Sequence, residues 1–144
     1  MDELRNYYTT DQTGLALAVQ ESKKSNCCKR LVGAVIVTVS GELHTGYNHS
    51  LIPHTCTRLT SKSGTNLDKC PAIHAEVDAI VGAYLTNVFN ATIYVSAPIP
   101  CKDCANAIVV SGISKVVCYL GHYDDLGGTI LLENNVQIVQ YKEL

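Results

Sequence analysis

Two short segments of the chain carry residue types that can hold a metal ion. They are His74-Ala75-Glu76 and Pro100-Cys101-Lys102-Asp103-Cys104. A catalytic zinc site takes three protein ligands and keeps one position open for water, and one imidazole with two thiolates would supply the three. Cysteines with C-x-x-C spacing can reach one metal ion from a single helical turn, and a helix N-terminus favours their thiolate form. The sequence therefore predicts one catalytic zinc ion bound by His74, Cys101 and Cys104.

Glu76 supplies a group that such a metal site could use for proton transfer. It lies two residues after His74, so its carboxylate can lie beside the metal without binding it. Zinc lowers the pKa of its bound water to about 7, and a nearby carboxylate could take a proton from that water and pass it to a substrate. We therefore expect Glu76 to be the catalytic residue.

Simpler explanations exist for each segment alone. A single C-x-x-C is often a redox pair or half of a structural zinc site. A structural site would close its fourth position with a further Cys or His, and Glu76 would then have no role. The two segments together, each expected to open a helix, favour the catalytic site.

The residues around these segments predict alternating helices and strands. Helices are expected over 10–22, from His74, over 101–111 with Gly112 closing it, and near 129–133. Strands are expected over 32–39, 43–47, 91–97, 115–120 and 136–139, with a turn at Ser40-Gly41-Glu42 and a long polar loop over 49–72. The helix from His74 is expected to be buried through Val77, Ala79, Ile80, Val81 and Leu85. The order indicates a layered α/β sheet with helices on both faces, and helical crossovers imply that the later strands pair in parallel.

Length and composition narrow the class of protein. A chain of 144 residues fits a single domain, expected to span residues 1–144. Without a membrane span or an apolar leader after Met1, a cytoplasmic protein is expected. The net charge of −2 gives no hint of a large nucleic-acid surface. Seven cysteines in such a protein point to metal binding or catalysis before disulfides.

The whole pattern resembles a known family. His74, Glu76 and the two cysteines match the H-x-E…P-C-x-x-C signature of zinc nucleobase deaminases. Four blocks resemble the deoxycytidylate (dCMP) deaminase family of the cytidine deaminase superfamily, and Gly121–Asp124 matches it weakly. The four blocks are 27–37, 45–48 with its G-Y-N turn, 74–80, and 93–95 followed by 100–105 and 111–116. The resemblance implies a three-layer α/β/α cytidine-deaminase-like fold with a mixed five-stranded sheet.

The resemblance also implies an activity and a set of partners. It implies a zinc-dependent hydrolase that converts dCMP to dUMP and ammonia, with His74, Cys101 and Cys104 as zinc ligands and Glu76 as the proton shuttle. The expected partners are a nucleotide substrate and further copies of the chain, commonly a hexamer in the family.

Three further residues are candidates for binding the substrate. The resemblance implies that Asn48 helps to hold the sugar or base and that Tyr123 borders the pocket, and we add Ala75. Asn48 could instead be a turn residue that tolerates unusual backbone angles, and Tyr123 could serve loop packing.

Two residues depart from the family pattern. His49 stands where the family usually has Gly, in a turn used for allosteric binding of dCTP. A side chain there could block the approach of a phosphate to the backbone, so we expect weak or absent feedback by dCTP. Asp78 stands where the family commonly has Asn, and an acid cannot donate the hydrogen bonds of an amide. Asp78 alters specificity if it touches substrate, and otherwise it is a charge on the helix surface.

The remaining cysteines raise the question of a second zinc ion. Some family members carry a structural zinc held by cysteines before the first strand and in the long loop. Cys27 and Cys56 occupy matching places, and Cys70 precedes the metal helix. A metal could order a loop that has few apolar residues, whereas the alternative is free, partly buried thiols. Cys118, in an apolar strand, is expected in the core.

Other functions stay open from the sequence alone. The chain could deaminate another free nucleotide, nucleoside or base, such as dCTP, cytidine or guanine, or the adenosine of a tRNA. A tRNA-acting enzyme would be expected to have a more basic surface than a net charge of −2 suggests. A zinc-stabilised binding module without activity is the alternative from a different class, and the presence of Glu76 argues against it.

Overall fold

A mixed five-stranded sheet forms the centre of the molecule. The computed structural model describes residues 10–27, 30–52, 71–121 and 125–143. The strands lie in the order β2-β1-β5-β6-β7. They span Leu43–Tyr47 (β2), Gly33–Val37 (β1), Thr92–Val95 (β5), Lys115–Tyr119 (β6) and Gln137–Tyr141 (β7). Strand β1 runs antiparallel to β2 and β5, whereas β5, β6 and β7 run parallel, which confirms the predicted pairing of the later strands.

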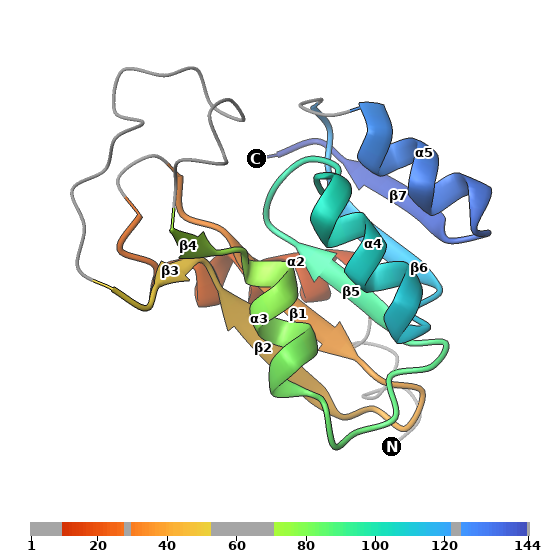
Figure 1. The fold of residues 1–144 in the computed structure, drawn as a ribbon, viewed down its shortest axis with the longest axis horizontal. Coiled ribbons are helices and arrows are strands. Elements are labelled where there is room, and N and C mark those ends of the chain that lie inside the picture. Colours follow the sequence, from red (N-terminus) through yellow and green to blue (C-terminus); the bar gives the residue numbers. More distant parts are fainter. Residues whose placement is uncertain (1–9, 28–29, 53–70, 122–124, 144) are drawn as a thin grey trace.

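Helices cover both faces of this sheet. Helix α2 (Asp11–Ser22) lies on one face, and α3 (Ala75–Gly82), α4 (Lys102–Ser111) and α5 (Asp125–Glu133) lie on the other (Figure 1). The three-layer α/β/α arrangement is therefore confirmed.

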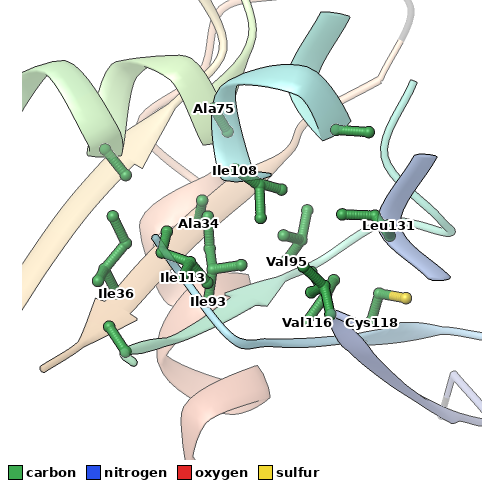
Figure 2. Packing of buried hydrophobic residues seen from close by; sticks show 14 residues of the cluster. Ala34, Ile36, Ala75, Ile93, Val95, Ile108, Ile113, Val116, Cys118 and Leu131 are labelled. Atoms are coloured by element: carbon green, nitrogen blue, oxygen red, sulfur yellow. The ribbon is translucent and has the colours of Figure 1, made fainter. Parts of the chain in front are cut away.

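Strand β1 shows how the two layers of core are built. All five of its residues are buried, because neighbouring side chains of a strand point to opposite faces and both faces are covered. Ala34 and Ile36 join the core beneath α3, α4 and α5, where Ile108 and Leu131 pack toward the sheet (Figure 2). Val35 and Val37 join the smaller cluster beneath α2.

Helix α2 is fixed to the sheet by its first residues. The Thr10 side chain accepts a hydrogen bond from the Thr13 amide, which caps the helix. The Asp11 carboxylate accepts hydrogen bonds from Lys115 Nζ on β6 and from the Tyr141 hydroxyl on β7, each at 3.1 Å. These contacts connect the helix to two strands that are distant in sequence.

The two ends of the long loop expected over 49–72 form a short second sheet. Strands β3 (His49–Ser50) and β4 (Ala72–Ile73) form an antiparallel pair in which His49 lies opposite Ile73. The prediction of irregular structure is therefore wrong at both ends of this segment. The pair carries the chain directly into His74 and helix α3.

Two helices differ from expectation. In α3 the buried residues are Ala75, Glu76 and Ala79, whereas Val81 is 62% exposed and Leu85, beyond the helix, is 84% exposed. The expectation that Val81 and Leu85 are buried was wrong because the helix is short and only its inner face meets the sheet.

Helix α5 begins at Asp125, four residues before the predicted start. It includes two buried glycines, Gly127 and Gly128. A helical glycine costs about 1 kcal/mol relative to alanine. At Gly127 this cost has a structural reason, because the helix packs there against the backbone of Pro100, just before α4, and leaves no room for a side chain.

No helix in the described ranges is long and apolar enough to cross a bilayer.

Candidate functional site

The starts of α3 and α4 bring the two candidate segments together. His74 is the N-cap of α3 and Cys101 is the N-cap of α4, and neither side chain caps its own helix. Each residue nevertheless anchors its helix through its carbonyl, which accepts from the Asp78 and Ala105 amides at 3.0 and 2.8 Å respectively. The two side chains therefore stay free of their own helices and meet at the carboxyl end of β5. Ligands of α/β sheets bind at this end of the strands.

The geometry of this group fits a tetrahedral zinc ion. His74 Nδ1 lies 3.3 Å from Cys104 Sγ and 3.6 Å from Cys101 Sγ, and the three ligand atoms lie within 4.8 Å of one another. A tetrahedral zinc with Zn–N and Zn–S bonds of about 2.0 and 2.3 Å holds N and S about 3.5 Å apart. Within the residues the structure describes, this is the one His/Cys/Asp/Glu group with such spacing. No fourth ligand joins these three among the described residues, and a three-ligand set is typical of a catalytic zinc site, whereas a structural site has four.

Glu76 lies beside this group and is not a member of it. It is 6% exposed, in the first turn of α3, and its carboxylate hydrogen-bonds the Cys104 side chain. Burial raises the pKa of the carboxyl above its usual value, and the neighbouring His74 counteracts that shift in part. A carboxylate buried beside the metal ligands is placed to exchange a proton with a group bound there.

The two cysteines differ in how they hold a proton. A hydrogen bond from Cys104 is the main cause that lowers the pKa of Cys101 to about 4. The pKa of Cys104 is raised, chiefly because it is the donor in this hydrogen bond and also because it is buried. Metal binding requires both sulfurs as thiolates, so the proton held on Cys104 would leave when a metal binds.

Strand β2 supports helix α3 from behind. A Cβ on Gly46 would lie 2.5 Å from the Ala75 carbonyl oxygen and 2.4 Å from the Ala79 nitrogen. Only glycine allows this approach. One residue on, the Tyr47 amide donates to Asp78 Oδ2 at 3.1 Å. These contacts fix the first turn of α3, which carries His74 and Glu76.

Asp78 thus has a structural contact that neither sequence interpretation included. It is not simply a surface charge, since its carboxylate binds the backbone of β2 and lies 3.9 Å from His49 Nδ1. The structure therefore brings together the two residues that depart from the family pattern. His49 Nδ1 also lies 2.8 Å from the Tyr47 carbonyl oxygen.

Replacing Asp78 tests this contact. Asp78→Ala should lower the free energy of unfolding by about 1 kcal/mol or somewhat more, because the Tyr47 amide loses its acceptor. Asp78→Asn keeps an acceptor oxygen in the same place, so its free energy of unfolding should fall clearly less. Urea unfolding of both variants measures the difference. Equal losses would show that the charge, and not the hydrogen bond to Tyr47, stabilises the protein.

Asn48 is buried, and its side chain bonds to the segment before β1. Its Oδ1 accepts from the Val32 amide at 2.9 Å and its Nδ2 donates to the Arg30 carbonyl at 2.7 Å. In the described part of the chain, Asn90 and Asn135 are the non-glycine residues with positive φ, so the alternative of an unusual backbone angle at Asn48 is wrong. Its role in substrate binding stays a prediction.

The other candidates divide into those the structure describes and those it does not. Ala75 is fully buried, with its methyl group in the core beneath α3, and its substrate role stays a prediction. Cys27 is a half-buried free thiol. Tyr123, Cys56 and Cys70 lie outside the described residues, so the second zinc stays a prediction. Cys118 is fully buried in the core, as expected.

Sequence reasoning missed the residues that hold the two helix starts in place. These are Gly46 behind α3 and Gly127 in α5, which lies against Pro100. A Gly inside a strand and a Gly pair inside a helix are the available signals, because both cost stability unless something packs closely against them.

The α/β/α fold with a His/Cys/Cys group at two converging helix starts defines a deaminase-type zinc domain. A family model described as "Cytidine and deoxycytidylate deaminase zinc-binding region" matches residues 8–120, and the chain belongs to this family. Its cofactor is zinc, and the His74, Cys101 and Cys104 group can hold it.

Individual relatives carry a more specific name. The chain is 34% identical over 140 residues to "Deoxycytidylate deaminase" of Schizosaccharomyces pombe and 38% identical over 114 residues to that of Saccharomyces cerevisiae. These matches cover 91% and 74% of this chain, but only 44% and 36% of the two yeast proteins. The chain therefore spans less than half the length of either relative.

A solved structure has the same fold over almost the whole chain. It is the dCMP deaminase from the cyanophage S-TIM5 in complex with dCMP and dUMP, with a TM-score of 0.73 at 21% identity. The similarity covers 98% of both chains.

Proposed function

We propose that this chain is a zinc-dependent hydrolase that converts dCMP to dUMP and ammonia. The observation that carries the proposal is the placement of the buried Glu76 beside a three-ligand His/Cys/Cys group with the spacing of a zinc site. The name shared by the yeast relatives supports dCMP as the substrate.

The roles of the residues follow from their chemistry. His74, Cys101 and Cys104 would hold the zinc ion, and bound zinc supplies a Lewis acid that makes water a better nucleophile at neutral pH. In the overall reaction the water oxygen forms a bond to C4 of the cytosine ring, the C4–N bond breaks, and the amine leaves as ammonia.

Glu76 would move the protons that this exchange requires. Its carboxylate takes a proton as the water attacks, delivers it to the ring nitrogen, and assists the departure of the amine. The position of Glu76 supports this role, because a general base must lie within hydrogen-bond reach of the proton it moves, and this carboxylate lies beside the ligand group.

A substrate panel tests the proposal. Ammonia release should be measured in parallel with dCMP, dCTP, cytidine, cytosine, guanine and adenosine, and dCMP should give the highest kcat/KM. The protein stripped of metal should release none, and adding zinc back should restore the rate. Turnover of another compound with none of dCMP would overturn the choice of substrate, and no turnover of any would favour a binding module.

The proposal also covers the domain organisation, the assembly and the location of the protein. We include a single domain over 1–144, a homo-oligomer with the hexamer as its expected form, and a cytoplasmic location. A net charge of −2 supports a free nucleotide rather than a nucleic acid as the partner.

A further inference from the structure

Helix α5 touches the backbone of the segment that carries Cys101. Helices α4 and α5 pack side by side on the same face of the sheet (Figure 1). A Cβ on Gly127 would lie 1.9 Å from the Pro100 carbonyl oxygen, 3.0 Å from the Pro100 carbonyl carbon and 3.2 Å from the carbonyl carbon of Cys101. The contact therefore lies on the peptide that joins Pro100 to Cys101.

The neighbouring glycine lacks such a contact. A Cβ on Gly128 would meet its nearest atoms, two side-chain carbons of Ile99, at 3.7 Å. That distance is an ordinary van der Waals contact. Both glycines are buried in the same helix, so they differ chiefly in what a side chain would push against.

The peptide that Gly127 touches has little freedom to move elsewhere. Pro100 is fully buried. The Cys101 carbonyl accepts the hydrogen bond from the Ala105 amide that begins α4. Helix α5 is itself anchored by Leu131, which is 0% exposed in the core. A side chain at position 127 would therefore displace the Cys101 segment or force the whole helix outward.

We propose that Gly127 is a positioning residue for the zinc site: its lack of a side chain lets α5 hold the Pro100–Cys101 peptide where the Cys101 sulfur meets His74 and Cys104. Metal sites keep their ligand distances within about 0.2 Å, whereas relieving the contact at Gly127 needs a shift of about 1 Å. The inference rests on the proposed function, because the ligands it positions are those of the proposed zinc site.

The experiment compares Gly127→Ala with Gly128→Ala. Both changes add one methyl group to α5 and gain the same helix propensity. Each protein is loaded with Co²⁺ in place of zinc, its thiolate-to-cobalt charge-transfer band is recorded, and zinc affinity is measured by competition with a chelator. Gly127→Ala should bind zinc about 10–100-fold more weakly and show a weaker or shifted charge-transfer band, whereas Gly128→Ala should match the wild type.

Kinetics with dCMP add a second readout. In Gly127→Ala saturated with metal, kcat should fall while KM changes little, because displacing a metal ligand affects the reacting atoms more than the contacts that bind the nucleotide. Wild-type affinity, spectrum and kcat in Gly127→Ala would overturn the inference and leave the proposed function standing. A wild type without any thiolate-to-cobalt band would overturn both.

A measurement on the wild type covers the case in which Gly127→Ala does not fold. If α5 positions Cys101, then by linkage zinc binding must stabilise the contact with α5. Hydrogen exchange should therefore slow on zinc binding in peptides covering 125–133 as well as in those covering 101–111. Slowing confined to 101–111 would overturn the inference.

Discussion

Cys104→Ala should give a protein that folds and no longer retains zinc. The variant keeps His74 and Cys101, but two protein ligands do not make the three-ligand set that a catalytic zinc needs. We expect a loss of zinc affinity well beyond the roughly 10–100-fold that changes outside the ligand set cost. Cys101→Ala should behave in the same way, because its sulfur lies at a similar distance from His74 Nδ1.

Cys118→Ala is the matched control for this experiment. Cys118 is as buried as Cys104 but lies in the core on β6 and is not part of the three-ligand group. This variant should lose some stability through a small cavity and retain its zinc. Metal analysis of the purified proteins measures the zinc content of all three variants. Full zinc occupancy in Cys101→Ala and Cys104→Ala would show that the ligand assignment is wrong.

The ligand group could be predicted because its residues lie in two short segments whose residue types and spacing are typical of metal binding. C-x-x-C spacing places two sulfurs on one turn of a helix. The sequence also predicts both ends of this helix. Pro100 suits the position just before its start, and Gly112, at φ +88°, ends it as predicted. The buried strand β1 was equally visible, because a run of β-branched residues is typical of a strand covered on both faces.

The supports of the site could not be predicted in the same way, because they depend on contacts between distant segments. Nothing in the sequence pairs Asp78 with the Tyr47 amide, 31 residues away. Gly127 resembles a helix breaker in sequence, yet in the structure it lies inside α5, at a point where the Pro100 carbonyl leaves no room for a side chain. Val81 follows an apolar pattern, and its exposure depends on how far α3 extends over the sheet.

Glu76→Gln should leave a folded protein that holds zinc and turns over dCMP very slowly. Glutamine has the size of glutamate and keeps an acceptor oxygen near Cys104, but an amide cannot carry a proton at neutral pH. Its kcat should fall by at least the roughly 10²–10⁴-fold typical of losing a general acid–base. The loss could be larger because one carboxylate serves both the attack of water and the departure of the amine. KM for dCMP should change little, since the contacts that bind the nucleotide remain.

Asp103→Asn is the matched control, because it also replaces a carboxylate by an amide near a cysteine ligand. Asp103 lies in the first turn of α4 next to Cys104, but its side chain is 84% exposed and paired with Lys102. Its replacement should leave kcat within a few-fold of the wild type. Single-turnover deamination and zinc content are measured on the same samples. A structural role for Glu76 predicts lost zinc or lost stability in Glu76→Gln, whereas a role in proton transfer predicts lost turnover alone. Near-normal turnover with zinc intact would remove Glu76 from the mechanism, and with it the observation on which the proposed activity chiefly rests.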